Sequence, residues 1–232
     1  MLTWENNETT TCTECSRKSE MFNYLSPQEL DFITKHKYEI KYKKGEILKK
    51  QGTHLSHVVS INSGLVKMYI EGYRGKNLIL RILNSTNFIG GPGLYFDQKH
   101  HYSVMALTET NACFIEVQAI KQIIRTNPDF AAEFIKEISK NTLSTYERLI
   151  SISQKQIPGR ISDALLYLSR DIFKSNIIHS SITKNDLSEL AGMTKDSVIK
   201  ILREFKEDGI IKMDKDIEIL DEDKLIKISN VG

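Results

Sequence analysis

The side chains best suited to binding a ligand lie between Thr194 and Arg203. Apolar residues recur there at helical spacing, so a helix would bury one side and expose the other. The exposed lysine and arginine side chains could reach phosphates or guanine edges, the aspartate could accept from cytosine N4, and the serine suits either base edge. The sequence therefore predicts a face that contacts double-stranded DNA, formed by Thr194, Lys195, Asp196, Ser197, Lys200 and Arg203.

Helix-end signals surround this face. Thr183 is predicted to begin one helix, with Asp186 at its third position, and Gly192 to end it. Thr194 is predicted to cap a second helix, which a β-hairpin over 210–220 follows. A helix, a tight glycine turn and a second helix form the helix-turn-helix arrangement. Two amphipathic helices joined by a glycine also occur in domains that bind no DNA, so the spacing alone leaves both interpretations open.

The three cysteines indicate a second kind of chemistry. Cys12 and Cys15 form a Cys-x-x-Cys pair, and Cys113 lies in a predicted strand. Three cysteines are too few, and odd in number, for the disulfide framework of a secreted protein, which favours a reducing cytoplasm. Thiolates can bind a metal, whereas a single buried cysteine is usually a small apolar core residue.

The composition gives no sign of secretion or of a membrane span. Lys+Arg number 32 and Asp+Glu 30 in 232 residues, so the formal net charge of +2 neither favours nor excludes nucleic acid. No apolar run reaches the ~18 residues that a membrane helix needs. Residues 1–11 lack the basic start and apolar core of a secretory signal. We expect a cytoplasmic protein that does not contact a membrane.

Hydrophobic periodicity changes along the chain. From 38 to 117, short alternating segments are separated by glycine turns, which is typical of a β-sandwich or β-barrel. From about 127 to 154 the period is helical, and one stripe follows alternating steps of four and three, as in a two-stranded coiled coil. This stripe either forms a homodimer seam or packs on its own β domain. It consists of Ala131, Ile135, Ile138, Thr142, Thr145, Leu149 and Ile152. Pro158 and Gly159 then mark a domain boundary.

In the order of these motifs, the chain resembles the Crp/Fnr superfamily of bacterial transcription regulators over about 25–228. Glycines recur in that family's order in Lys44-Gly45-Glu46, Gln51-Gly52, Ser63-Gly64 and Asn87-Phe88-Ile89-Gly90. The segment Gly192-Met193-Thr194-Lys195-Asp196-Ser197-Val198 resembles the family's recognition turn. The resemblance implies an α+β fold with an N-terminal β-roll (jelly-roll-like) domain, a long dimerisation helix and a C-terminal winged helix-turn-helix domain.

The resemblance also implies the domain limits and the partners. A cysteine-containing segment would span 1–24, the β-roll sensor 25–125, the dimerisation helix 126–155 and the winged helix-turn-helix domain 156–232. Lys195, Asp196 and Lys200 fall where family members contact bases. The implied protein is a homodimer on a near-palindromic operator, with RNA polymerase as a further partner. The sequence carries no acid–base or nucleophile constellation, so we expect no enzymatic activity.

The effector is harder to predict. Cyclic-nucleotide-binding members carry Gly-Glu and, some ten residues later, Arg-Ser, where the arginine pairs with the cyclic phosphate. Here Gly91 follows Gly90 where the glutamate would stand, and His101 and Tyr102 replace Arg-Ser. A buried phosphate without a guanidinium loses its bidentate partner, which argues against cyclic AMP. The pocket is expected to be lined by Gly90, Gly91, His101, Tyr102, Ile152 and Ser153.

A redox cofactor is the second implied effector. Fnr-type members bind an iron–sulfur cluster through N-terminal cysteines and one β-roll cysteine, and Cys12, Cys15 and Cys113 resemble part of that set. Met21 stands in place of the third N-terminal cysteine, whereas such clusters normally need four thiolates. Glu14, Glu20 or a water could supply the fourth ligand. A zinc-binding or vestigial Cys-x-x-Cys, and haem held by His100 or His101, are open alternatives.

Two other classes of protein are alternatives to a DNA-binding regulator. A redox or haem gas-sensing module could act through protein contacts rather than through DNA. A cupin-type enzyme would need a histidine and glutamate metal set on strands, for which His54-x-x-His57 in a predicted loop is the only hint.

Overall fold

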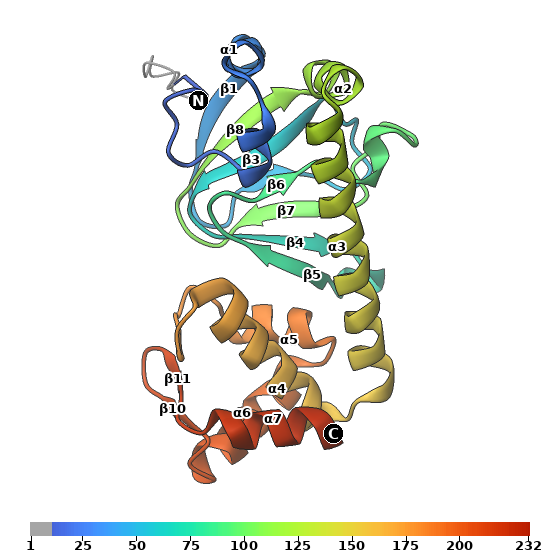
Figure 1. Cartoon of the computed structure of the whole chain (residues 1–232). Coiled ribbons are helices and arrows are strands. Elements are labelled where there is room, and N and C mark those ends of the chain that lie inside the picture. The colour runs from blue at the N-terminus through green and yellow to red at the C-terminus, as the bar shows by residue number, and fades with distance from the viewer. Residues whose placement is uncertain (1–10) are drawn as a thin grey trace.

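Two antiparallel sheets form the N-terminal half of the chain in the computed structural model, which describes residues 11–232 (Figure 1). The first sheet has the order β1-β8-β3-β6, with β1 at Lys37–Tyr42, β8 at Thr110–Glu116, β3 at His57–Ser63 and β6 at Phe88–Ile89. The second has the order β2-β7-β4-β5, with β2 at Ile47–Lys49, β7 at Ser103–Ala106, β4 at Val66–Ile70 and β5 at Leu78–Leu83. Strands distant in sequence thus alternate within each sheet, and the predicted β-roll is confirmed.

The apolar faces of the two sheets meet in one core. Val59, Ile61 and Phe114 come from the first sheet, and Val66 and Val104 from the second. Each fully buried side chain of this kind stabilises the fold by about 1.5–3 kcal/mol. The alternation seen in the sequence therefore places one face of each strand inward.

Gly64 makes the tight turn between β3 and β4. Its φ of +94° lies in the left-handed region. A Cβ at this position would lie 2.4 Å from the carbonyl oxygen of Glu109. The turn therefore requires glycine for both its conformation and its space.

Helices cover one end of the β domain and lead away from it. They are η1 at Glu20–Tyr24, α1 at Pro27–Lys35, α2 at Val117–Thr126 and α3 at Pro128–Gln154. Ser26 caps α1 through a capping box with Glu29. Asn127 caps α3 by accepting from the N–H of Phe130, and its Nδ2 donates to Glu29 and to the carbonyl of Tyr24. One amide thus joins the starts of two helices.

The long helix predicted to end near 154 is confirmed as α3. At 1.5 Å per residue its 27 residues span about 40 Å. It runs down one side of the molecule from the β domain to the C-terminal domain (Figure 1). Within residues 11–232, no helix is long and apolar enough to cross a membrane.

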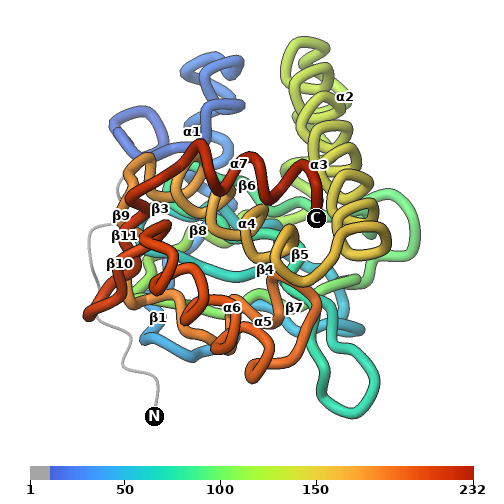
Figure 2. The backbone as a smooth tube through the Cα atoms, turned by 90° about the horizontal axis from the view of Figure 1, so that it is seen from below, coloured from blue at the N-terminus to red at the C-terminus, as the bar shows by residue number. Residues whose placement is uncertain are grey.

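The C-terminal domain combines helices with a small sheet. Its elements are α4 at Ile157–Tyr167, η4 at Leu168–Phe173, β9 at Ile177–Ile178, α5 at Lys184–Ala191, α6 at Lys195–Glu207, β10 at Ile211–Met213, β11 at Ile217–Ile219 and α7 at Glu222–Val231. The predicted hairpin is β10-β11, and β9 extends it to three strands. Viewed from below, α4 and α7 lie together while α5 and α6 form a separate layer (Figure 2). The predicted winged helix-turn-helix domain is therefore confirmed.

The two domains share a continuous apolar core. Leu65, Ile79 and Ile82 of the β domain belong to the same buried cluster as Leu187 and Leu190 of α5. The sequence did not predict this contact. The domain limits at 25, 126 and 156 remain predictions, and the segment 1–24 lies partly outside the described residues.

A buried ion cluster lies at the same junction. Nζ of Lys67 on β4 is 2.8 Å from Oδ1 of Asp186 and 2.7 Å from Oε2 of Glu189, both on α5. Burial alone would lower the pKa of Lys67, but hydrogen bonds to the two carboxylates outweigh burial and raise it. The ammonium therefore stays charged at neutral pH, and its contribution to stability is lost only when the pH rises through that raised pKa.

We predict that Lys67→Met destabilises the protein by about 3–5 kcal/mol, because two buried carboxylates lose their counter-charge. The measurement is denaturant unfolding followed by circular dichroism. The matched control is Lys50→Met, which removes the exposed pair with Glu71 and should leave the unfolding midpoint close to that of the wild type. Equal losses in the two variants would show that the buried cluster does not hold the domains together.

Candidate functional site

The turn between α5 and α6 has the local structure that the sequence predicts. The hydroxyl of Thr183 accepts from the N–H of Asp186 at 3.1 Å, and the Asp186 carboxylate accepts from the N–H of Thr183 at 3.0 Å. Gly192 ends α5 in the left-handed conformation, with φ +62°. Thr194 then caps α6 by accepting from the N–H of Ser197 at 3.2 Å.

The two faces of α6 divide as predicted. Val198, Ile201, Leu202 and Phe205 are buried against the domain. Of the six predicted contact residues, Ser197 is half-buried and the other five are exposed: Thr194, Lys195, Asp196, Lys200 and Arg203. The nearest partner of Lys200 is Glu204, one turn further, at 3.9 Å. These side chains are therefore available to a ligand.

The dimensions of α6 suit the major groove of DNA. Its 13 residues span about 20 Å, and the groove is about 12 Å wide. The N-terminus of α6 carries a partial positive charge, which favours an approach to phosphates. The side chains that would contact DNA remain a prediction.

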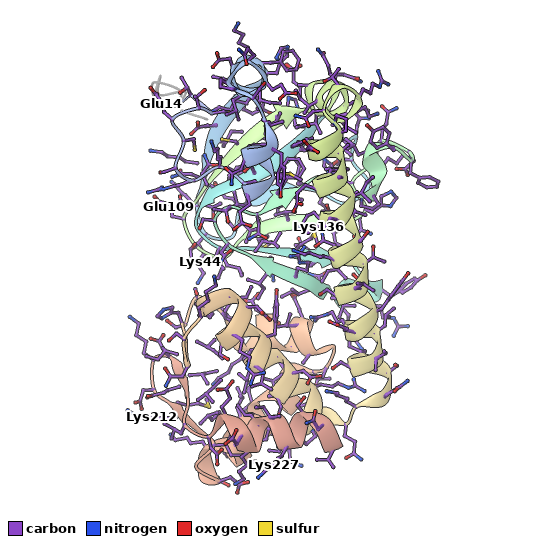
Figure 3. The ribbon with its side chains drawn as sticks, in the orientation of Figure 1. Glu14, Lys44, Glu109, Lys136, Lys212 and Lys227 are labelled. Atoms are coloured by element: carbon purple, nitrogen blue, oxygen red, sulfur yellow. The ribbon has the colours of Figure 1, made fainter. Side chains whose placement is uncertain are left out.

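The hairpin beside α6 adds a basic residue that the sequence analysis did not single out. Lys212 on β10 stands at the outer edge of the domain (Figure 3). Its Nζ lies 3.2 Å from Asp214, and both side chains are largely exposed. The alternating pattern of the predicted hairpin was the only signal that could have placed Lys212 on the outside.

The predicted effector pocket is divided by the structure. Gly90 lies beside Phe134 near the start of α3, where a Cβ would be 3.1 Å from the ring. Ile152 lies 18 residues further along the same helix, about 27 Å away, and packs against Gly192. Ser153 is exposed and its hydroxyl donates to the carbonyl of Ile150. Within one subunit, Ile152 and Ser153 therefore do not join Gly90 in one pocket.

Of the remaining pocket residues, Gly91 and Tyr102 lie together, whereas His101 is exposed. A Cβ on Gly91 would lie 2.9 Å from the hydroxyl of Tyr102, a buried side chain whose pKa burial raises. A glutamate side chain at 91 would need Tyr102 to move. His101 lies at the surface, with Nε2 3.0 Å from Oδ1 of Asp97.

Two of the three cysteines are packed in the core, and the third lies nearer the surface. Cys12 and Cys113 are buried, Cys15 is half-buried, and all three are free thiols. The sulfur of Cys113 accepts from Nδ2 of Asn62 at 3.0 Å. In the part of the chain that the structure describes, no three histidine, cysteine or acidic side chains are arranged to hold a metal ion. Cys12, Cys15 and Cys113 as placed therefore do not fit an iron–sulfur cluster or a zinc ion.

Burial also keeps Cys12 and Cys113 protonated. It raises the pKa of Cys113 to about 12, which the nearby Lys37 ammonium only partly offsets. It raises the pKa of Cys12 as well, against a hydrogen bond with Thr34. Metals bind the thiolate, so binding here would require these groups to lose their protons and to move. Met21, at the place of the third N-terminal cysteine, is buried in the apolar core beside Cys12.

Of the histidines considered as alternative ligands, His54 and His101 lie close enough to His100 for their charges to lower its pKa. His100 is buried, and burial, together with the nearby Lys49, lowers its pKa to about 4, so it is neutral near pH 7. His57 contacts Ser56 through Nδ1, and His54 forms a β-bridge with Lys99. These positions give no support to a cupin-type metal set among the described residues.

Comparisons with known proteins match both halves of the chain. The family model "Cyclic nucleotide-binding domain" matches residues 39–127, and "Crp-like helix-turn-helix domain" matches 159–228. The cAMP-activated global transcriptional regulator CRP of Salmonella typhimurium is 25% identical over 186 residues, 78% of this chain and 89% of that protein. The transcriptional activator protein Anr of Pseudomonas protegens is 24% identical over 197 residues, 83% of this chain and 80% of that protein. The structure of FixK2 from Bradyrhizobium japonicum aligns with a TM-score of 0.77 at 15% identity, covering 84% of this chain and 98% of that one.

We predict that alkylation at pH 8 labels Cys15 quickly and Cys113 slowly. Burial raises the pKa of Cys113 to about 12, so at pH 8 very little of it is the thiolate, and only the thiolate attacks. The rate at Cys113 should rise about tenfold per pH unit. Iodoacetamide labelling with peptide mass spectrometry measures both rates, and labelling in denaturant is the control. Equal rates in the folded protein would show that Cys113 is not held as a buried, neutral thiol.

Proposed function

This chain belongs to the Crp/Fnr superfamily of DNA-binding transcription regulators, and from that premise we propose that it acts as a homodimer on a near-palindromic site in double-stranded DNA. The observation that carries the proposal is the exposed polar face of α6, which begins at the capped residue Thr194. Its relatives are regulators rather than enzymes. We accordingly assign no catalytic role to any residue.

The proposed DNA contacts fall into two groups. Lys195, Asp196, Ser197 and Lys200 lie in the first half of α6, the part that enters the major groove in helix-turn-helix proteins. Thr194 and Arg203 flank that region and are suited to phosphate contacts. Arg203 is also long enough to reach a guanine edge.

Homodimer formation is supported by the uncovered face of α3. Ile135 is 64% exposed, Ile138 39% and Leu149 56%. All three occupy predicted seam positions, and large apolar side chains that recur along one helix face are typical of a protein–protein interface. Of the two interpretations of the stripe, a homodimer seam is therefore favoured over packing on the chain's own β domain.

The dimer would place the two α6 helices for a single operator. Dimeric helix-turn-helix proteins insert their recognition helices into successive major grooves about 34 Å apart. In this arrangement the two C-terminal domains must take a fixed relative position. A signal sensed in the β-roll would control binding by changing that position, with residues 154–159, where α3 ends and α4 begins, as the hinge.

The effector, the cellular compartment and the contact with the transcription machinery belong to the same proposal. We assign no effector to the β-roll, because Tyr102 occupies the space beside Gly91 and two of the three cysteines are packed in the core. We propose that the protein works in the cytoplasm and that RNA polymerase is a further partner.

We predict that Lys200→Ala weakens binding to the operator about 5- to 150-fold, the loss expected for one specific contact. If the contact is to a phosphate, the slope of log affinity against log salt should also fall by about one. Fluorescence anisotropy with a labelled duplex at several salt concentrations measures both quantities. Lys44→Ala, an exposed lysine in a turn of the β domain, is the matched control. If both variants bind the operator as tightly as the wild type does, the DNA must contact another part of the molecule.

We predict that Ile138→Asp converts the dimer into a monomer, because a carboxylate would be buried in an apolar seam. Sedimentation equilibrium over a range of concentrations measures the assembly. Leu143→Asp is the control, since Leu143 is 60% exposed on the same helix but lies off the seam. A wild-type chain that remains monomeric at every concentration would contradict the proposed dimer.

A further inference from the structure

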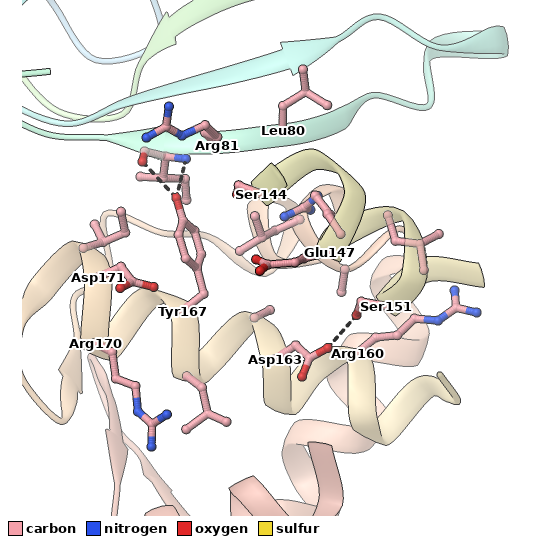
Figure 4. A pocket seen from close by; sticks show the side chains of 18 of the residues that line it. Leu80, Arg81, Ser144, Glu147, Ser151, Arg160, Asp163, Tyr167, Arg170 and Asp171 are labelled. Atoms are coloured by element: carbon pink, nitrogen blue, oxygen red, sulfur yellow. Dashed lines mark hydrogen bonds between the residues drawn. The ribbon is translucent and has the colours of Figure 1, made fainter. Parts of the chain in front are cut away.

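A cavity of about 910 Å³ lies where the β domain, α3 and the C-terminal domain meet. Figure 4 shows Arg81 on the strand above, Ser144 and Glu147 on α3, and Tyr167 reaching from α4 to the strand. The Tyr167 hydroxyl donates to the carbonyl of Ile82 and accepts from its N–H, both at 3.0 Å. Pockets for small molecules typically measure ~300–1,000 Å³ and lie between domains, so this cavity is of ligand size.

The wall of the cavity contains an unpaired guanidinium. Nε and Nη2 of Arg148 on α3 are inaccessible to solvent and have no hydrogen-bond acceptor within residues 11–232. Burial lowers the pKa of Arg148 to about 10, which still leaves it charged at neutral pH. A buried charge without a partner is costly, and buried donors are nearly always satisfied.

The other half-buried basic groups of the cavity have acceptors, whereas Lys140 and Arg170 are exposed. Arg81 donates to Oδ1 of Asn141 and lies 3.8 Å from Glu137. Lys155 is 2.8 Å from Asp163, and Nε of Arg160 donates to the carbonyl of Lys155. Arg148 is thus distinguished from its neighbours in the cavity by its open donors.

The acidic side chains of the cavity do not neutralise Arg148. Glu147 and Asp171 also line the space, but neither forms an ion pair with it in the described chain. Basic side chains outnumber acidic ones around the cavity. The local charge balance therefore favours an anion.

A second copy of the chain would not supply a counter-charge at the facing position. In a parallel pair of α3 helices with the predicted seam, Arg148 occupies the position before the seam residue Leu149. In a parallel coiled coil, this position contacts the partner helix just after its next seam residue, which here is Ile152. That position is Ser153, which carries no charge.

We propose that this cavity binds a small organic oxyanion, with its carboxylate or phosphate group on the guanidinium of Arg148 and its apolar part against Leu80, Ile150 and Ile172. A planar guanidinium matches either group with two parallel hydrogen bonds, and because Nε and Nη2 are covered in the ligand-free chain, binding requires the Arg148 side chain to turn toward the cavity. Because the cavity touches the sensor domain, α3 and α4, an occupant would contact all the parts whose relative position governs DNA binding. Occupancy itself does not depend on DNA binding, so this proposal and the proposed function can fail separately.

The test is a calorimetric titration of the full chain with inorganic pyrophosphate and, separately, with citrate, at constant ionic strength in chloride. Both probes should bind the wild type, and the tighter one identifies the preferred group. Arg148→Gln should weaken binding at least about tenfold, and Arg148→Lys should weaken it less. Arg125→Gln, which changes an exposed arginine at the end of α2, should bind as the wild type does.

The stability of the variant separates a lost ligand contact from a lost fold. Removing an unpaired buried charge should leave the ligand-free melting temperature of Arg148→Gln equal to or above that of the wild type. Failure of the wild type to bind either probe would overturn the proposal. Equal binding by Arg148→Gln and Arg125→Gln would also overturn it, as would a changed dimer constant in Arg148→Gln with unchanged anion binding.

Discussion

The arrangement of the molecule depends on one buried cluster, in which the ammonium of Lys67 lies between Asp186 and Glu189. Asp186 has a second task, because its other oxygen accepts from the backbone and hydroxyl of Thr183 at the start of α5. The carboxylate that begins the first helix of the helix-turn-helix thus also fixes that helix to the β domain. The local structure of the DNA-binding motif and its orientation toward the sensor are consequently coupled through a single side chain.

The long helix α3 serves two different neighbours with two different faces. Ile135, Ile138 and Leu149 form an apolar face that the chain itself leaves uncovered. Glu137, Asn141 and Arg148 form a polar face toward the cavity between the domains. A change in how two copies pack along the first face would therefore alter the geometry of the second, since one rigid helix carries both.

Local signals predicted the local structure well. The capping residues Thr183 and Thr194, the left-handed Gly192 and the helical period of α6 all act within a few residues, so the sequence alone is sufficient to place them. The same reason explains why the strands, the long helix and the hairpin were anticipated. The resemblance to a known family then supplied the order of the domains.

Long-range packing was not accessible in the same way. The contact of Tyr102 with Gly91, and that of Ile152 with Gly192, depend on how distant segments meet. The ion cluster of Lys67 joins residues more than a hundred positions apart in the sequence, and the residues next to each partner give no local signal of the contact. The cysteines were grouped by spacing, whereas their chemistry is decided by burial and by neighbours such as Asn62.

The amide of Asn127 has a mechanical consequence. It fixes the base of α3 to η1 and α1 by hydrogen bonds to Tyr24 and Glu29, while the remainder of the helix extends about 40 Å toward the other domain. Such a rod is a lever arm, and a tilt of about 3° at its base moves its tip by about 2 Å. A tilt too small to disturb the N-terminal packing would thus cause a larger displacement at the C-terminal end of α3, where the chain continues into α4.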